Sequence, residues 1–187
     1  MKLVFNHRWE HALLAAVISE AKEKCPGCFL GRTAIQKILY FLNVLGVPMR
    51  YDFDIYHYGP FCSSIMADVD WLIADNVITD GSSQGKYSDY RPGPASEELL
   101  DKFDSKISEH LPTIQNVVEA LGEMSPGDLE LIATLDFCYR WVSARGGKGP
   151  WKAETVKKFK SIKKDKFTNE EIDHWYGQLV NAELIKP

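Results

Sequence analysis

The stretch that decides the fold covers residues 32–61 and reads RTAIQKILYFLNVLGVPMRYDFDIYHYGPF. Its first part predicts a helix over residues 32–45, because apolar side chains recur there every three or four positions. Aromatic residues widen this apolar face, so we expect the helix to be buried on most sides. Gly46 and Pro48 then end it, since glycine favours the position after a helix and proline bars its continuation.

The second part of this stretch predicts a strand over residues 51–58. Polar and apolar or aromatic residues alternate there with a period of two, which is typical of a strand. Gly59-Pro60 is a strong turn signal, and proline suits the first turn of a following helix. We therefore expect that helix to occupy residues 61–75.

Working outward, the same spacing predicts a helix over residues 9–24 before this stretch and a hairpin over residues 77–91 after it. Three helices followed by a hairpin is the outline of a winged helix. From residue 95 the chain is predicted to be helical, with a kink or a break at Pro112 and new helices starting at Ser125 and Thr168. The fold class is therefore mainly α (α+β), a helical domain with a small winged-helix-like β-hairpin. We divide it into a winged-helix-like part, residues 1–94, and a helical part, residues 95–187, packed as one compact unit.

Composition narrows the class of protein. The 187 residues are 45% hydrophobic and 26% charged, which fits a globular domain and excludes a disordered or fibrous chain. No apolar run approaches the roughly 20 residues that span a bilayer, and the N-terminus lacks the apolar core of a secretory signal. We therefore expect a cytoplasmic protein with reduced thiols and without a membrane partner.

The N-terminal residues contain a pattern of zinc peptidases. His7, Glu10 and His11 match H-x-x-E-H, in which two histidines on one helix face hold Zn²⁺ and the glutamate polarises a water molecule. Only three residues are fixed and no third ligand is announced. We keep a zinc hydrolase as a remote alternative and otherwise expect no metal and no other cofactor.

Two of the four cysteines form a Cys-x-x-Cys motif, Cys25-Pro26-Gly27-Cys28. Such a motif can be half of a zinc site or a redox pair. Cys62 and Cys138 stand far away without a second paired motif, and a helix rather than a strand precedes Cys25. We interpret the motif as a loop with two incidental thiols.

Charge is unevenly distributed along the chain. The total is −4, from 22 basic and 26 acidic residues, yet the segment 148–166 carries eight lysines against two acids. Lys157, Lys158, Lys163 and Lys164 could therefore contact nucleic acid, and the other interpretation is a solvated helix face. The helix at 61–75, which a winged helix would insert into DNA, has three aspartates and no lysine or arginine. Because phosphate contacts need cations, this disfavours DNA reading.

The central stretch resembles a known family. The segments RTAIQKILYFL (residues 32–42) and YHYGPF (residues 56–61) are similar to the "LQKLLYF" helix and the aromatic strand ending in Tyr-Gly-Pro of the SocA-like (Panacea) antitoxin superfamily and its uncharacterised relatives. The stretches 128–135 and 166–172 also resemble those relatives. The resemblance implies a mostly helical domain that binds proteins, often a toxin encoded nearby or a phage-related partner, and it carries over no catalytic residue. The family-signature positions are Gln36, Lys37, Tyr40, Tyr56, Tyr58, Gly59 and Pro60.

The sequence thus favours a non-enzymatic protein-interaction module, antitoxin-like or regulatory, that binds a partner protein. A DNA-binding winged-helix regulator that uses the lysines of residues 148–166 is the alternative. The partner and the oligomeric state are left open.

Overall fold

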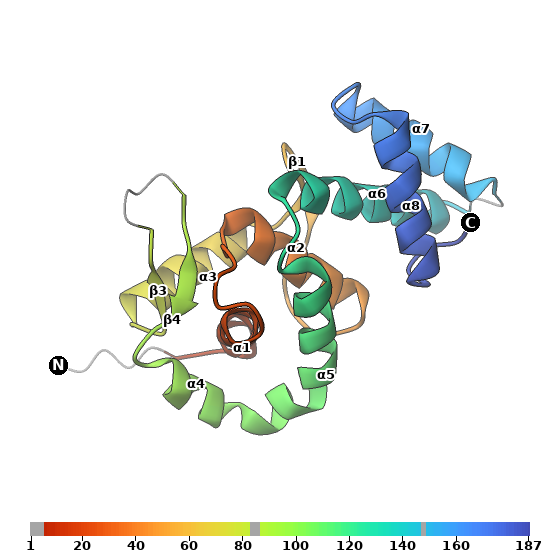
Figure 1. The fold of residues 1–187 in the computed structure, drawn as a ribbon. Helices are drawn as coiled ribbons and strands as arrows, with labels where there is room; N and C mark the ends of the chain where they lie inside the picture. The colour runs from red at the N-terminus through yellow and green to blue at the C-terminus, as the bar shows by residue number, and fades with distance from the viewer. Residues whose placement is uncertain (1–5, 83–86, 147–148) are drawn as a thin grey trace. The chain divides into compact units, whose positions relative to one another are not determined.

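The computed structural model describes residues 6–82, 87–146 and 149–187. It is mainly α, as predicted, with eight helices in the described residues (Figure 1). These residues also form two small two-stranded sheets, of which the sequence predicts one as a hairpin. Its contacts divide the chain into two compact units. Unit 1 comprises residues 1–53 and 61–124, and unit 2 comprises residues 54–60 and 125–187.

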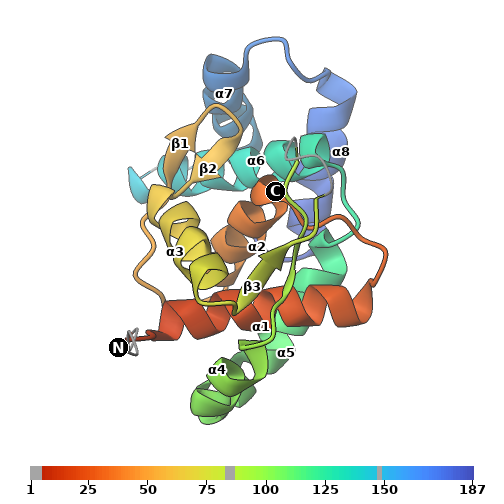
Figure 2. The same cartoon turned by 90° about the vertical axis from the view of Figure 1, so that its left-hand side faces the viewer.

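Unit 1 is built around helix α1, Trp9–Lys24, with the bounds that the sequence predicts. Every residue from Ala12 to Ile18 is buried, so this helix is covered on all sides rather than along one stripe. Helices α3, α4 and α5 and strand β4 pack against α1, which Figure 2 shows lengthwise. Its unbroken apolar run, Ala12–Ile18, explains why it lies in the centre of the unit.

The remaining elements of unit 1 follow the predicted order. Helix α2 (Arg32–Val44) ends before Gly46, which has a φ of +86°. Helix α3 (Ser63–Ala74) precedes strands β3 (Ile78–Asp80) and β4 (Tyr90–Pro92). The two strands are antiparallel and pair Thr79 with Arg91. Three helices and a hairpin thus occur as expected, and the predicted tip of that hairpin lies largely outside the described residues.

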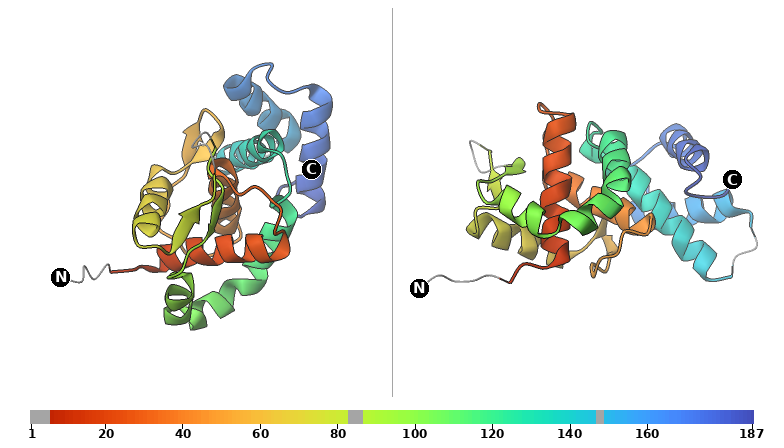
Figure 3. Two further views of the ribbon diagram at one scale, coloured as in Figure 1. Left: turned by 60° about the vertical axis from the view of Figure 1, so that its left-hand side comes forward. Right: turned by 90° about the horizontal axis from the view of Figure 1, so that it is seen from below.

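Helix formation continues through Pro112, so the predicted alternative of a break at this residue is wrong. Helix α5 (Asp104–Leu121) contains Pro112, and the chain breaks instead at Phe103, between α5 and helix α4 (Ser96–Lys102). Proline removes one backbone hydrogen bond from a helix but leaves the other bonds in place. The apolar face of α5, with Ile114 and Val118 buried, stabilises the helix through that position, and α4 and α5 together pass α1 (Figure 3).

Unit 2 consists of three helices and a short hairpin. Helix α6 (Pro126–Ala144) packs against α7 (Trp151–Lys163) and α8 (Asn169–Asn181). Both predicted helix starts are confirmed. Asp128 N donates to Ser125 Oγ at 3.1 Å, and Thr168 and Glu171 form a reciprocal capping box at 2.7 and 3.2 Å.

The Tyr-Gly-Pro segment differs from its prediction. The expected strand 51–58 is reduced to β1 (Asp54–Tyr56), and Gly59–Phe61 is a second strand, β2, rather than a turn and a helix start. The turn between them is His57-Tyr58. Gly59 has a φ of +87°, a conformation that glycine adopts without strain. The predicted division at residue 94 falls within unit 1, between β4 and α4. In the described part of the chain, no helix is both long and apolar enough to cross a membrane.

Candidate functional site

The family-signature positions of helix α2 are parts of the core of unit 1. Gln36 is 2% exposed, and its amide nitrogen donates to Cys62 O while its oxygen accepts from Cys62 N, both at 2.9 Å. This two-way bond ties α2 to the residue that precedes α3. Lys37 and Tyr40 are also buried, and the Tyr40 ring lies 5.4 Å from that of Phe53. These three residues therefore position elements and offer no surface.

The signature positions of the β1–β2 segment lie in unit 2 and include exposed rings. Tyr56 and Tyr58 are 59% and 63% exposed, with His57 exposed between them, whereas Gly59 and Pro60 are buried. We call residues 54–60 the tyrosine hairpin. Its glycine and proline are buried, and its tip exposes three consecutive aromatic side chains.

An ion cluster around the buried Glu130 contacts the tyrosine hairpin. Lys163 Nζ donates to the carbonyl of His57 and to Glu130 Oε1, both at 2.8 Å. Lys166 Nζ donates to both oxygens of Glu130 at 2.8 Å, and the same ammonium lies 5.3 Å from the centre of the Tyr58 ring. The side chains of Lys163 and Glu130 are only 4% and 3% exposed. One carboxylate thus faces two ammonium groups, which leaves a positive charge beside the exposed ring.

The four lysines of the nucleic-acid alternative are not equivalent. Lys157 and Lys164 are exposed. Lys158 is half-buried, with its ammonium 4.2 Å from the Trp141 ring, which Arg145 also contacts at 3.8 Å. Lys163 is buried in the cluster described above and does not reach solvent. The sequence pattern could not predict this burial, because the spacing of lysines along the chain does not show which of them neutralises a buried acid and which is solvated.

Of the zinc-peptidase pattern, the two histidine rings lie together, with their centres 5.9 Å apart, and Glu10 does not join them. His7 Nε2 lies 2.8 Å from Asp75 Oδ2, and His11 Nε2 lies 3.3 Å from Asp68 Oδ1. Glu10 is buried and accepts a hydrogen bond from Arg50 N at 3.1 Å. Each histidine therefore has its own carboxylate, and the glutamate binds backbone elsewhere.

Asp68 in helix α3 and Asp75 directly after it belong to a cluster that sequence reasoning missed. Arg8 donates to both oxygens of Asp68 at 2.8 and 2.9 Å, and the Tyr51 hydroxyl donates to Asp68 Oδ2 at 2.8 Å. A cavity of about 270 Å³ lies beside this cluster, lined by the two histidines, Arg8, both aspartates and Trp71 among others. Asp68 and Asp75 are thus paired within unit 1. They contribute less negative surface to α3 than their number in the sequence suggests.

Burial and charge shift two protonation equilibria in this cluster. Burial raises the pKa of the Tyr51 hydroxyl, and the neighbouring Asp68 carboxylate adds to the effect. Burial also lowers the pKa of His11 from its ordinary 6.5, against the opposing pull of Asp68. Nδ1 of His11 accepts from Arg8 N at 3.3 Å, and Nε2 lies 3.3 Å from Asp68 Oδ1.

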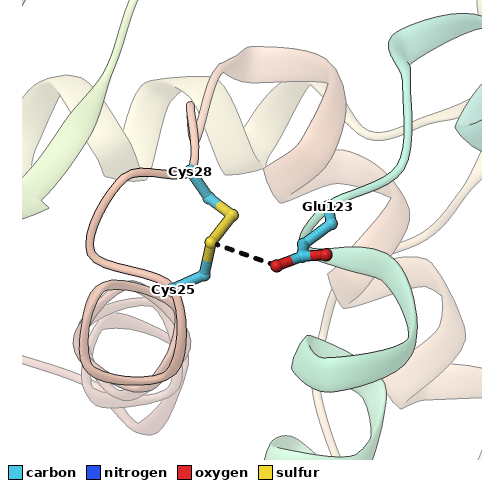
Figure 4. Close-up of side chains that lie close together, drawn as sticks. All are labelled: Cys25, Cys28 and Glu123. Carbon is cyan, nitrogen blue, oxygen red and sulfur yellow. Dashed lines mark hydrogen bonds between the residues drawn. A yellow bond between two sulfur atoms is a disulfide. The ribbon is translucent and has the colours of Figure 1, made fainter.

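The Cys-x-x-Cys motif forms a third feature. Cys25 and Cys28 are joined by a disulfide, which contradicts the expectation of reduced thiols at these positions. Glu123 Oε1 lies 3.5 Å from Cys25 Sγ, and these three residues form one group of potential metal ligands among the described residues (Figure 4). Cys62 and Cys138 are free and buried, and burial raises the pKa of Cys138 to about 12. The sequence could not show Glu123 here, since it is 95 residues from Cys28.

Comparison with known proteins finds one curated relative of unestablished role. The chain is 26% identical over 167 residues to the uncharacterised protein YwgA of Bacillus subtilis (strain 168), a match that covers 88% of this chain and 90% of that protein. No protein-family model matches the chain. The chain is therefore similar over nearly its whole length to an uncharacterised protein.

Proposed function

We propose that this protein is a non-enzymatic protein-interaction module that binds an acidic segment of a partner protein through the tyrosine hairpin. The observation that carries the proposal is the pair of exposed tyrosines, Tyr56 and Tyr58, on a hairpin whose backbone is held by the buried Lys163. Single exposed aromatic residues are common and need no explanation, whereas these two lie two positions apart on one short hairpin.

Tyrosine is suited to this role for physical reasons. Its ring has much contact area and few rotatable bonds, and its hydroxyl can still form hydrogen bonds, so it is enriched at interfaces and among their energetic centres. Lys163 anchors the His57 carbonyl, which lies between the two tyrosines. A backbone that is already fixed loses less conformational freedom when a partner binds.

Charge favours an acidic partner segment. Unit 2 contains 11 basic and 10 acidic residues, whereas the rest of the chain contains 11 and 16. Next to the hairpin, Lys166 lies beside the Tyr58 ring and shares Glu130 with Lys163. A carboxylate of the partner would meet that surplus ammonium charge at the edge of the aromatic contact.

The resemblance to SocA-like (Panacea) antitoxins suggests the kind of partner. In that superfamily the partner is often a toxin encoded beside the antitoxin, in the cytoplasm. The order of helices α1–α3 and hairpin β3–β4 is compatible with a winged helix used as a protein-binding platform, since one fold serves many functions.

The test is binding to the product of the neighbouring gene, measured by isothermal titration calorimetry with the full chain. We expect Tyr56→Ala and Tyr58→Ala each to weaken binding by about 10- to 30-fold, because truncation of a central interface ring typically costs about 1.4–2 kcal/mol. The matched control is Tyr87→Ala, which removes an equally exposed tyrosine (66%) from unit 1 and should leave the affinity unchanged. If Tyr56→Ala and Tyr58→Ala bind as tightly as the wild type and the Tyr87→Ala control, the proposed site is contradicted.

A second candidate function is nucleic-acid binding through helix α7 and the segment after it. It is favoured by Lys157 and Lys164, which are exposed in the middle of α7 and directly after its end. Neutralising Lys157, Lys158 and Lys164 should abolish salt-dependent DNA binding if this candidate is right. Lys163 is left unchanged in that variant, because its loss would unpair Glu130 and disturb the fold.

A further inference from the structure

We propose that Cys25 and Cys28 form a thiol–disulfide exchange site whose substrate is a thiol and in which Glu123 accepts the proton of Cys25. The site lies in unit 1 and is independent of the tyrosine hairpin. It consists of the CPGC loop (residues 25–28), which follows α1, and of Glu123, which follows α5 (Figure 4).

The backbone of the CPGC loop is held by bonds that do not depend on the disulfide. Cys25 N donates to Ala21 O, and Cys28 N donates to Cys25 O, both at 3.0 Å. Lys22 Nζ donates to the Cys28 carbonyl at 2.5 Å and to Asp89 Oδ1 at 2.7 Å. The two Cα atoms are 5.3 Å apart. After reduction the two sulfurs would therefore stay close enough to reform the bond without refolding of the loop.

The site is open to a substrate. Both cysteines are partly exposed and line a cavity of about 220 Å³ together with Glu119, Glu123 and Lys24. In contrast, the free Cys62 and Cys138 are 6% and 0% exposed. A dissolved thiol can therefore reach Cys25 and Cys28, and the other two sulfurs are shielded.

The charges around the loop give the two sulfurs different roles. Glu123 faces Cys25, and Cys25 caps the C-terminal, negative end of α1, so an incoming thiolate is repelled from that sulfur. Cys28 is next to the Lys22 ammonium, which bonds its carbonyl. The other charged groups of the cavity, Lys24 and Glu119, are paired with each other at 2.7 Å. We therefore assign Cys28 as the sulfur that an external thiolate attacks.

The exchange reduces the protein disulfide in one direction and reforms it in the other. When a thiolate RS⁻ attacks Cys28, the Cys25–Cys28 bond breaks and an R–S–S–Cys28 mixed disulfide forms. Cys25 leaves as a thiolate and takes up, through solvent, the proton that RSH lost on ionising. A second RS⁻ then releases RSSR and Cys28, so that two electrons pass from two thiols to the protein disulfide. In the closing direction Cys25 attacks Cys28 of the mixed disulfide, RS⁻ departs, and the proton of Cys25 passes to the Glu123 carboxylate. RS⁻ finally takes that proton through solvent.

The experiment uses the full chain and glutathione as the probe, with alkylation quench and intact-mass analysis. We expect native protein to interconvert between disulfide and dithiol while Cys62 and Cys138 stay unmodified. Oxidised glutathione should form a stable mixed disulfide with Cys28 in Cys25→Ser. It should modify Cys25 in Cys28→Ser at least about tenfold more slowly, because the negative charge around Cys25 disfavours the thiolate that must attack and repels the anionic glutathione disulfide.

The role of Glu123 is tested by the closing step. Glu123→Gln should slow the release of glutathione from the mixed disulfide by about 100-fold at pH 7, since a positioned general base contributes about that much. Its rate should then rise with pH more steeply than that of the wild type. Glu119→Gln, which changes a neighbouring acid of the same cavity, is the matched control and should close at the wild-type rate. Equal thermal unfolding temperatures of the reduced variants exclude a general loss of structure.

Three results would overturn the proposal. The first is a disulfide that glutathione reduces only in denaturant, and the second is a closing rate that Glu123→Gln leaves unchanged. The third is stoichiometric Zn²⁺ held by the reduced wild type and lost in Cys25→Ser, Cys28→Ser and Glu123→Gln, which would assign the same group as a metal site. To learn whether the natural thiol is a small molecule or a protein cysteine, the trapped Cys25→Ser adduct from cells is identified by mass.

Discussion

Single residues in unit 2 connect burial to the proposed function. Lys163 and Glu130 are both almost fully buried, and each satisfies the other's charge. A lysine at this depth is tolerated only because it has an acid and a carbonyl as partners. The same contacts fix the tyrosine hairpin, so a change at either residue affects both stability and binding.

We expect Lys163→Met to lower the free energy of unfolding by about 3 kcal/mol or more, because it leaves a buried carboxylate with one partner fewer. Urea unfolding followed by circular dichroism measures this. Lys152→Met is the control, since the Lys152–Asp173 pair is about half exposed and should change stability by less than about 1 kcal/mol. Equal losses in the two variants would show that burial does not govern the Lys163 contact.

His11 gives a pH dependence whose sign follows from its environment. Its pKa is lowered in the folded chain, chiefly by burial, so the unfolded chain binds more protons between that lowered value and 6.5. The free energy of unfolding should therefore fall as the pH drops from 7.5 through 6.5, and the loss should level off once folded His11 is also protonated. His11→Gln should flatten this slope, whereas His174→Gln, at an exposed position of α8, should keep it. Urea titrations at pH 7.5, 6.5 and 5.5 give the free energy of unfolding at each pH. An unchanged pH slope in His11→Gln would contradict this assignment.

At the scale of helices and strands, the sequence predicted the features that depend on neighbouring residues in the chain. The bounds of α1 and the caps at Ser125 and Thr168 follow from apolar spacing and from side chains that bond nearby backbone. Strand β2 was missed because its partner strand, rather than its own Gly-Pro-Phe composition, defines it. The helix through Pro112 was missed because packing outweighed the local preference.

The bond between α2 and Cys62 is the element contact whose loss we expect to matter most. Gln36→Leu removes the amide group that bonds both the N–H and the carbonyl of Cys62. Because both backbone groups are then buried without that partner, the free energy of unfolding should fall by about 2–4 kcal/mol. Gln115→Leu is the matched control, because Gln115 is only half-buried and bonds the Glu20 side chain. Chemical denaturation of both variants gives the comparison, and a Gln36→Leu chain as stable as the control would refute the clamp.

At the scale of the whole molecule, the net charge of −4 is an incomplete description. Unit 1 has five more acidic than basic residues, and unit 2 has one more basic than acidic residue. Several acids that sequence counting assigned to an anionic helix surface, such as Asp68 and Asp75, are paired with arginine or histidine. Pairings between residues 60 or more positions apart, and the approach of Glu123 to Cys25, depend on the tertiary fold. Periodicity could not predict them.

The candidate site was predicted in part. The Tyr-Gly-Pro signature led to the tyrosine hairpin, whereas Gln36, Lys37 and Tyr40 proved to be core residues. Motif resemblance cannot separate these two kinds of position, since both are constrained by the fold. Burial separates them, because only Tyr56 and Tyr58 among the seven signature positions are exposed.

We propose the tyrosine hairpin as the surface that a partner protein covers. Amide hydrogen exchange of the full chain, with and without a saturating amount of the neighbouring gene's product, tests it most directly. We predict slower exchange at residues 54–60 in the complex and unchanged exchange in helix α3. Binding that protects α3 or the exposed part of α7, and leaves residues 54–60 as they were, would contradict the claim.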